Sequence, residues 1–183
     1  MARQEQPALR APCGLCLRPW RATDAADVVK AFQDPAIQRW HLLRVTTEEQ
    51  ARQWIELRQR SWSAELGANW AVANDATDSI VGRVGLRRVS LSTGEAELTY
   101  WVLPKERGRG IAVHAVNELS RWCLEDLQLH RLTIAHSTAN GASCRVAIKA
   151  SFIYEGTMLS QVKHTDGWHD MHLHARINAK GST

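Results

Sequence analysis

The sequence predicts an α+β fold, an α/β sandwich in which helices flank a mainly antiparallel sheet of about seven strands. Two observations predict it. Segments with the alternation of a strand and segments with the spacing of a helix follow one another through most of the 183 residues. Three strand-like segments stand in succession between residues 70 and 104, joined by short polar turns, which is typical of antiparallel neighbours.

The first half of the chain is expected to contain one strand and two helices before these central strands. The strand covers residues 14–17 and the first helix residues 23–33. The second helix, residues 46–62, starts with a capping box in which Gln50 follows Thr47 by three positions. Its core face is expected to carry Ala51, Trp54, Ile55 and Trp62.

The second half supplies the rest of the sheet and two further helices. A closing hairpin at residues 154–177 is expected to turn at Asp166 and Gly167. The other expected elements are strands at 70–75, 80–91, 95–104 and 131–138, and helices at 111–127 and 140–152.

The composition is that of a globular protein. We expect a single domain at residues 13–177 between loose tails at 1–12 and 178–183. Hydrophobic residues make up 44% of the chain, and no apolar run approaches the roughly 18 residues that span a bilayer, so we expect no membrane partner. The first residues are too polar for a signal peptide, and we expect a cytoplasmic protein. The net charge of +4 is modest and no nucleic-acid-binding motif accompanies it, so we expect no nucleic-acid partner.

The four cysteines are expected to be structural. Cys13 and Cys16 form a CxxC pair, which could be half of a zinc site or a redox pair. A zinc site of this kind needs a second pair, and the isolated Cys123 and Cys144 do not supply one.

The histidines give a second candidate for a metal site. His172 and His174 alternate on one strand face with Asp170, a spacing that could bind zinc. The sequence fixes no further ligand, and exposed polar residues on strands are commoner, so we expect no metal. His136, on the strand at 131–138, could accept a substrate proton, but a packed or hydrogen-bonded side chain is the commoner alternative.

A glycine-rich turn, Arg107 to Gly110, separates the strand at 95–104 from the helix at 111–127. The start of a helix presents unpaired N–H groups and the positive end of the macrodipole, which together suit a diphosphate. Glycine at 108 and 110 removes the Cβ atoms that would block close approach or forbid a positive φ. A flexible charged loop would have a similar composition, so spacing alone leaves both interpretations open.

Residues Arg107 to Ala112 match the Arg/Gln-x-x-Gly-x-Gly/Ala signature of the GNAT superfamily of acyl-CoA-dependent N-acyltransferases, at the place where that family has it. The resemblance runs from about Leu15 to Ile177. It is strongest for the RimJ/RimL branch, which acetylates protein N-termini and has relatives acting on antibiotics and small amines. The stretches that carry it are "LRPWRATDAADV", "AELTYWVLP", "NGASCRVAIKASFIYEG" and "DGWHDMHLH".

The resemblance implies a GNAT fold, with a mixed, mainly antiparallel, twisted sheet, and acetyl-CoA as cosubstrate. In relatives the strands that match residues 99–103 and 132–137 part to admit the pantetheine arm. A backbone N–H at Val102 or Leu103 would polarise the thioester carbonyl, and Asn140 matches a residue that hydrogen-bonds the pantetheine. The backbone that binds the pyrophosphate in relatives matches Arg107, Gly108, Arg109, Gly110, Ile111 and Ala112.

The same resemblance implies two catalytic residues. Ser143 matches a hydroxyl that protonates the departing thiolate, although it could serve only as a helix-start residue. Glu97 is the candidate base, because an ammonium must lose a proton before it attacks, and the branch often carries a carboxylate here. Strand alternation puts Glu95, Glu97, Thr99 and Trp101 on one face, so the alternative is that the carboxylates only solvate that face.

Three residues are expected to bind the acceptor. Trp40 and His41 lie in an expected loop before the helix at 46–62, which shapes the acceptor pocket in relatives. Thr99 stands where relatives usually carry glycine, and the chain also departs from the branch at residues 149–152, which read Lys-Ala-Ser-Phe in place of Lys-x-Gly-Phe. Both departures fall near the acceptor or thiol end of the expected cleft and bear on substrate identity.

The expected reaction is direct transfer of an acetyl group from acetyl-CoA to a primary amine, without an acyl-enzyme on Cys144. The expected acceptor is a protein or peptide N-terminus. Two alternatives remain open: a small-molecule amine such as an antibiotic, a polyamine or an amino sugar, and an acyl-CoA-binding module that has lost turnover. The oligomeric state is left open between a monomer and a homodimer.

Overall fold

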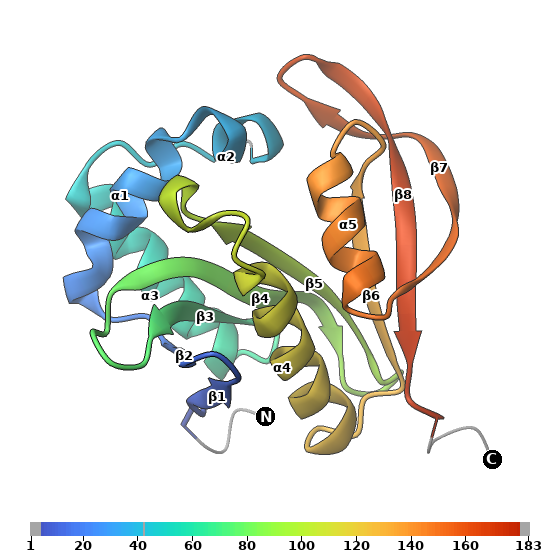
Figure 1. Cartoon of the computed structure of the whole chain (residues 1–183), viewed down its shortest axis with the longest axis horizontal. Helices are drawn as coiled ribbons and strands as arrows, with labels where there is room; N and C mark the ends of the chain where they lie inside the picture. The colour runs from blue at the N-terminus through green and yellow to red at the C-terminus, as the bar shows by residue number, and fades with distance from the viewer. Residues whose placement is uncertain (1–4, 42, 180–183) are drawn as a thin grey trace.

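The structure, a computed structural model that describes residues 5–41 and 43–179, confirms the α+β fold (Figure 1). Its described part holds one sheet of eight strands, one more than expected, in the order β1-β2-β3-β4-β5-β6-β8-β7. Neighbouring strands are antiparallel except β5 and β6, which are parallel. The strands are β1 (Leu9–Ala11), β2 (Leu15–Pro19), β3 (Gly67–Asn74), β4 (Ile80–Ser90), β5 (Glu95–Val102), β6 (Arg131–Ser137), β7 (Ile153–His164) and β8 (Gly167–Ile177).

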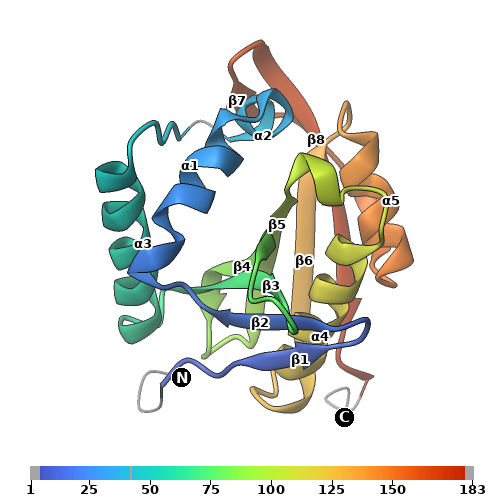
Figure 2. The same ribbon diagram turned by 60° about the vertical axis from the view of Figure 1, so that its left-hand side comes forward.

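The helices cover both faces of this sheet. Figure 2 shows α1 and α3 on one face and α4 and α5 on the other. In the described part of the chain no helix is long and apolar enough to cross a membrane. The helices are α1 (Ala25–Gln33), α2 (Pro35–Trp40), α3 (Glu48–Ser63), α4 (Ile111–Glu125) and α5 (Gly141–Lys149), with 3-10 helices η1 (Ala22–Asp24) and η2 (Pro104–Glu106).

The structure corrects the expected N-terminal tail. Within residues 1–12, the strand β1 pairs antiparallel with β2, and its first and third residues are buried in the core. Three residues are too few to reveal a period, so the sequence did not predict this strand. Both expected tails lie partly outside the described residues. At the start of the tail at 178–183, the Asn178 side chain donates to two backbone carbonyls at and just beyond the end of α4.

The helix α2 replaces the loop that was expected before α3. The Asp34 carboxylate accepts a hydrogen bond from the Ile37 N–H at 2.9 Å, and Pro35 stands at the first helical position. This Asp-Pro pair is a helix-start signal, but six residues carry too little periodicity to predict a helix by spacing. Trp40 is the last residue of α2 and His41 is its C-cap.

The closing hairpin forms as expected, with a turn one residue earlier. The last residue of β7, His164, pairs with the first residue of β8, Gly167. The turn residues are therefore Thr165 and Asp166, not Asp166 and Gly167.

Two apolar clusters hold the helices to the sheet. On the face of α1 and α3, Phe32 and Trp54 pack near Trp101 of β5 in one cluster. On the face of α4, Leu119 packs with Leu132 of β6 in the other cluster. Fully burying each such side chain contributes roughly 1.5–3 kcal/mol, so these clusters fix the helices against the strands.

The parallel strands β5 and β6 diverge, as the resemblance implies. Their pairing covers only Glu95–Glu97 of β5 and Arg131–Thr133 of β6. Both strands continue beyond that point, to Val102 and to Ser137. The divergence leaves space between them at the end nearest to α2 and α5.

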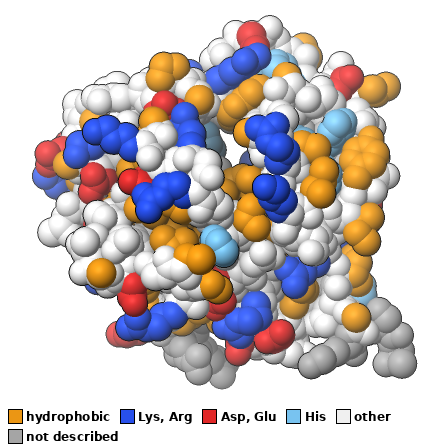
Figure 3. Space-filling model, in the orientation of Figure 1, with side chains coloured by type: hydrophobic (Ala, Val, Ile, Leu, Met, Phe, Trp, Pro, Cys, Tyr) orange, Lys and Arg blue, Asp and Glu red, His pale blue; other side chains and the backbone are white. Residues whose placement is uncertain are grey.

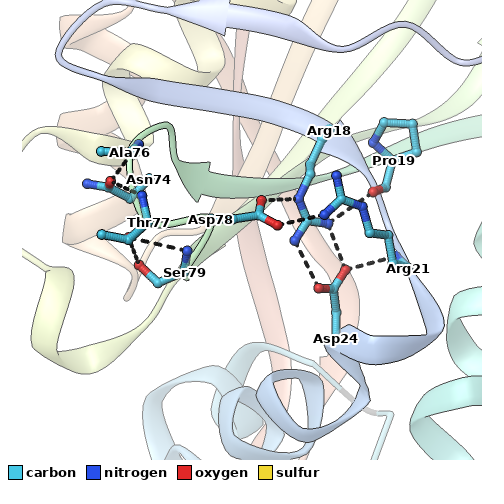
Figure 4. A network of polar contacts seen from close by, with 9 residues as sticks. All are labelled: Arg18, Pro19, Arg21, Asp24, Asn74, Ala76, Thr77, Asp78 and Ser79. Carbon is cyan, nitrogen blue, oxygen red and sulfur yellow. Dashed lines mark hydrogen bonds and ion pairs between the residues drawn. The ribbon is translucent and has the colours of Figure 1, made fainter.

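An ion-pair network joins β2 to η1 and to the turn between β3 and β4 (Figure 4). Arg18 of β2 donates to both oxygens of Asp24, at 2.8 and 2.9 Å, and each of these residues is at most 6% exposed. Its Nε donates at 2.6 Å to Asp78, which is more exposed and also accepts from Arg21. Hydrogen bonding to Asp24 raises the pKa of Arg18 above its usual value. The guanidinium is thus charged and paired although it is buried.

Asp24→Ala is expected to lower the free energy of unfolding by about 3 kcal/mol, because it leaves a buried guanidinium with one of its two carboxylates. The effect falls at the low end for a broken buried pair, since Asp78 still binds Arg18. Urea unfolding followed by circular dichroism measures it. The control Asp78→Ala removes an exposed partner and should cost about 1 kcal/mol or less. Equal losses in the two variants would contradict the expectation.

Candidate active site

A cavity of about 520 Å³ lies where β5 and β6 diverge. Four parts of the chain line it: α2 with His41, the end of β5, the turn from η2 into α4, and α5. In Figure 3 a hollow opens in this region, with basic side chains on both sides of it. The cavity therefore brings together segments that are more than 100 residues apart in the sequence.

The glycine-rich turn forms one wall of the cavity. Gly108 has φ 80° and Gly110 has φ 76°, both in the left-handed region that favours glycine. Gly110 is the N-cap of α4, and Gly110, Ile111 and Ala112 line the cavity. The first turn of a helix has N–H groups without intrahelical partners and the positive end of the macrodipole. This wall is thus suited to bind a phosphate group.

The two arginines of the turn have different places. Arg107 lines the cavity, and it donates to the Val102 carbonyl at 3.1 Å and to the Asp34 carboxylate at 2.5 Å. Burial opposes ionisation of Asp34, but the hydrogen bonds from Arg107 and Ile37 outweigh it and lower the pKa of that carboxyl. Arg109 lies outside the cavity lining and pairs with Glu106. Arg107 therefore ties the turn to α2, and Arg109 does not reach the cavity.

Two further cations line the cavity from α5, and neither was predicted from the sequence. Arg145 and Lys149 stand four positions apart on this helix, so they project from the same face. That spacing was the available signal, but only the placement of α5 beside the turn shows that this face borders the cavity. With Arg107 they give the cavity a positive lining.

The backbone N–H groups of Val102 and Leu103, the two expected donors, differ in their surroundings. The Leu103 N–H donates to the Val81 carbonyl at 3.0 Å, so it is already paired, and Leu103 does not line the cavity. Successive N–H groups along a strand point to opposite edges, so the Val102 N–H points away from β4 and towards the gap beside β6. Of the two expected donors, Val102 has the right geometry and Leu103 has not.

A chain of polar groups connects β5 with α5 inside the cavity. The Tyr100 hydroxyl lies 2.7 Å from Ser143 Oγ and 3.1 Å from the Ser143 carbonyl oxygen, which accepts from it. Asn140 caps α5, since its Oδ1 accepts from the Ser143 N–H at 3.1 Å. All three residues line the cavity. Burial raises the pKa of Tyr100 to about 12, so its hydroxyl is protonated at neutral pH.

Tyr100 was not predicted as a site residue, because the side chains expected to act from this strand lie on its other face. Strand alternation puts Tyr100 on the opposite face from Glu97, Thr99 and Trp101. The cavity reaches Tyr100 because α5 packs against this face and brings Ser143 to it.

The structure places Glu97 outside the lining of this cavity. It is 4% exposed, it does not line the cavity, and its carboxylate pairs with Arg87 and, at 3.0 Å, with Arg88. Two guanidinium groups thus contact both oxygens of this carboxylate. The structure therefore gives Glu97 a place in an ion-pair cluster, because its strand register sets it opposite Arg87 of β4.

Of the three residues expected to bind the acceptor, two line the cavity and one does not. Trp40 and His41 line the cavity at the end of α2, whereas Thr99 does not line it and accepts from Arg83 at 3.1 Å. Burial lowers the pKa of His41 to about 4, and the positive charge of Arg83 adds to the effect. The imidazole is thus neutral at physiological pH.

A cavity between diverging strands, with a helix start suited to a phosphate group at one end and a hydroxyl pair beside it, is the arrangement expected for the acyl-CoA-dependent acyltransferase class. Residues 14–153 match the family model described as the acetyltransferase (GNAT) domain. The chain belongs to this family, and it is an N-acetyltransferase of the GNAT type.

Curated relatives agree with this assignment. The chain is 25% identical over 154 residues to the uncharacterized N-acetyltransferase YoaA of Bacillus subtilis, which covers 84% of this chain and 86% of the relative. It is 29% identical over 100 residues to a ribosomal-protein-serine acetyltransferase of Escherichia coli, over 55% of this chain and 56% of the relative.

Solved structures share the fold. The RimL ribosomal L7/L12 α-N-protein acetyltransferase in complex with coenzyme A superimposes with a TM-score of 0.87, over 94% of this chain and 99% of that one, at 18% identity. This match confirms the expected GNAT fold for nearly the whole chain.

Proposed function

We propose that the enzyme transfers the acetyl group of acetyl-CoA directly to a primary amine in a ternary complex, and that the acceptor is a protein or peptide N-terminus. The observation that carries the proposal is the single cavity that joins the helix start at Gly110 to the Tyr100–Ser143 pair and to Trp40. The ribosomal-protein acetyltransferase activity in the name of the Escherichia coli relative supports the choice of acceptor.

Each wall of the cavity has one task in this proposal. The backbone from Gly108 to Ala112 holds the diphosphate of the coenzyme, and Arg145 and Lys149 add positive charge. The Val102 N–H donates to the thioester carbonyl and stabilises the negative charge that develops on its oxygen. Ser143 and Tyr100 pass a proton to the departing thiolate, and the hydroxyl that gives it up regains one from the amine nitrogen, which loses a proton as the amide forms. Asn140 holds the first turn of α5 and can donate its amide to the pantetheine.

We do not assign Glu97 the role of a base. Both of its carboxylate oxygens are ion-paired, and the residue lies outside the cavity lining. The amine enters beside Trp40 and His41 at the end of α2. The indole gives this end an apolar surface against which the chain of an acceptor residue can pack.

Thiol release from acetyl-CoA tests the function. We expect release with peptides that have a free N-terminus and none with the same peptides after N-terminal blocking. Aminoglycosides, polyamines and amino sugars form the comparison panel. Release with one of these and not with peptides would assign a small-molecule acceptor, and no release with any amine would overturn the proposal.

The pH dependence of kcat/KM should reflect the ionisation of the acceptor amine and not that of a group on the enzyme. His41 is the histidine among the described residues that line the cavity, and with a pKa of about 4 it does not ionise between pH 6 and 9. We expect kcat/KM to rise tenfold per pH unit up to about pH 8 for an α-amine, and up to about pH 10 for a lysine-like amine. Profiles of both acceptors with wild type and His41→Ala measure this. An acidic limb at the same pH for both acceptors would instead assign a base on the enzyme.

A further inference from the structure

A cluster of three histidines and one cysteine lies between α5 and the sheet, and the proposed transfer uses none of its four side chains. One ligand atom from each of His136, Cys144, His172 and His174 lies within 4.8 Å of the others. The strand register explains how the histidines meet. His136 of β6 pairs with His172 of β8, and Ile134, two residues before His136, pairs with His174. The three imidazoles thus share the sheet face that α5 covers, and α5 brings Cys144 to them.

The protonation of His136 is set by its neighbour. Its Nδ1 lies 2.9 Å from the Ser137 carbonyl oxygen, which can only accept, so Nδ1 carries the hydrogen. In the neutral ring Nε2 is then an acceptor, and it lies at hydrogen-bond distance, 3.2 Å, from Nε2 of His174. A histidine that binds a metal commonly donates its other ring N–H to a backbone carbonyl in this way.

The cluster also contains a polar atom that the protein leaves unsatisfied. Within the described part of the chain, Nδ1 of His172 is buried and has no hydrogen-bond partner. Burying such a group costs free energy unless a ligand compensates. The other two histidines are more deeply buried, since His136 and His174 are 4% and 1% exposed.

We propose that His136, Cys144, His172 and His174 form a zinc site. Three imidazole nitrogens and one thiolate are a donor set that Zn²⁺ binds tetrahedrally, at about 2.0–2.1 Å from nitrogen and 2.3 Å from sulfur. These lengths place two nitrogens of a tetrahedron roughly 3.3 Å apart, and the two Nε2 atoms of His136 and His174 are already 3.2 Å apart. All separations among the four ligand atoms are within 4.8 Å, so none has to close by more than about 1.5 Å. On binding, the Cys144 thiol loses its proton to solvent.

Asp170, which alternates with the two histidines of β8, is not part of this site. Its Oδ1 accepts from the Ser160 N–H of β7 at 2.7 Å. The third and fourth ligands come instead from β6 and α5. The Tyr154 ring packs edge-on against His172 and His174, at 5.1 and 5.5 Å between centroids.

The position of Cys144 connects the site to the cavity. Cys144 follows Ser143 in the first turn of α5, and its own N–H donates to the Asn140 carbonyl at 3.2 Å. A zinc ion bound to Cys144 would fix this turn against β6 and β8, and would thereby orient Ser143 and Asn140. The zinc is structural in this proposal, and its binding does not depend on the proposed acetyl transfer.

Cobalt binding to the full chain tests the site. Protein freed of metal with a chelator is titrated with Co²⁺ alone and then with Zn²⁺. We expect one ion per chain, with the intense d–d bands of tetrahedral cobalt and a thiolate-to-cobalt charge-transfer band, both lost when Zn²⁺ displaces Co²⁺. Cys144→Ser should abolish the charge-transfer band and weaken binding by at least tenfold, and His136→Gln should weaken binding to a similar extent.

The control is Cys13→Ser, which removes an exposed thiol outside the cluster, 3.5 Å from His114. It should keep the cobalt spectrum of the wild type. Circular dichroism of each metal-free variant shows whether it is folded, and added Zn²⁺ should raise the melting temperature of wild type and Cys13→Ser but not of Cys144→Ser. No cobalt bound at micromolar concentration, or a charge-transfer band that survives in Cys144→Ser, would overturn the proposal.

Discussion

Gly110→Glu is expected to weaken acetyl-CoA binding by about 1000-fold. Gly110 is the left-handed N-cap of α4, and a side chain in that conformation costs about 1–2 kcal/mol. The added carboxylate would also stand at the N–H groups that hold the diphosphate. Hydrogen bonds to a charged group contribute roughly 1.5–3 kcal/mol each, so losing two of them accounts for a change of this size. Isothermal titration calorimetry with acetyl-CoA measures the dissociation constant.

Gly14→Glu is the matched control, because Gly14 has φ 70° and lies outside the cavity lining. It should lower stability by a similar backbone strain and leave the affinity for acetyl-CoA within about threefold. Equal affinity in Gly110→Glu and wild type would show that the start of α4 does not bind the coenzyme. Equal weakening in both variants would show that the effect is loss of structure and not loss of the site.

Replacing both hydroxyls of the cavity, in the double variant Tyr100→Phe with Ser143→Ala, is expected to lower kcat by about 1000-fold. General acid catalysis contributes 10²–10⁴-fold, and these hydroxyls are 2.7 Å apart and can deliver one proton between them. We expect each single variant to lose less than the double, because the remaining hydroxyl still reaches the thiolate. The single losses should then combine non-additively. Steady-state thiol release measures kcat, and the dissociation constant for acetyl-CoA should change less than about threefold.

Ser61→Ala is the control for this pair. Ser61 is a half-buried residue of α3, and its hydroxyl donates to the Leu57 carbonyl within the same helix. It should keep the kcat of the wild type. If the double variant also keeps kcat within tenfold, the thiolate takes its proton from elsewhere, and the Tyr100–Ser143 pair has only a structural role.

The helices and the central strands could be predicted from the sequence because their signals are local. Thr47 caps α3 and accepts from the Gln50 N–H at 3.2 Å, as the capping box predicts. The helices α4 and α5, which line the cavity, were also predicted, at residues 111–127 and 140–152. Short elements were missed, because three residues in β1 and six in α2 show no usable period.

The site was predicted only in part, because the role of a side chain on a strand depends on which residue of the neighbouring strand it pairs with. Glu97 is a plausible base by position in the sequence, but the register sets it opposite Arg87, and Arg88 completes its pairing. Val102 and Leu103 are neighbours, yet the Leu103 N–H is hydrogen-bonded to Val81 of β4, whereas the Val102 N–H points to the gap beside β6.

The sequence by itself determined the fold class and the glycine-rich turn at the start of α4, since glycine conformation and helix starts are properties of a few consecutive residues. The tertiary structure alone decided which polar groups meet. Tyr100 reaches Ser143 because α5 packs against β5, and the cluster of His136, Cys144 and His174 forms because β6, β8 and α5 converge. Such contacts depend on strand register and helix placement over long sequence separations, which no local pattern encodes.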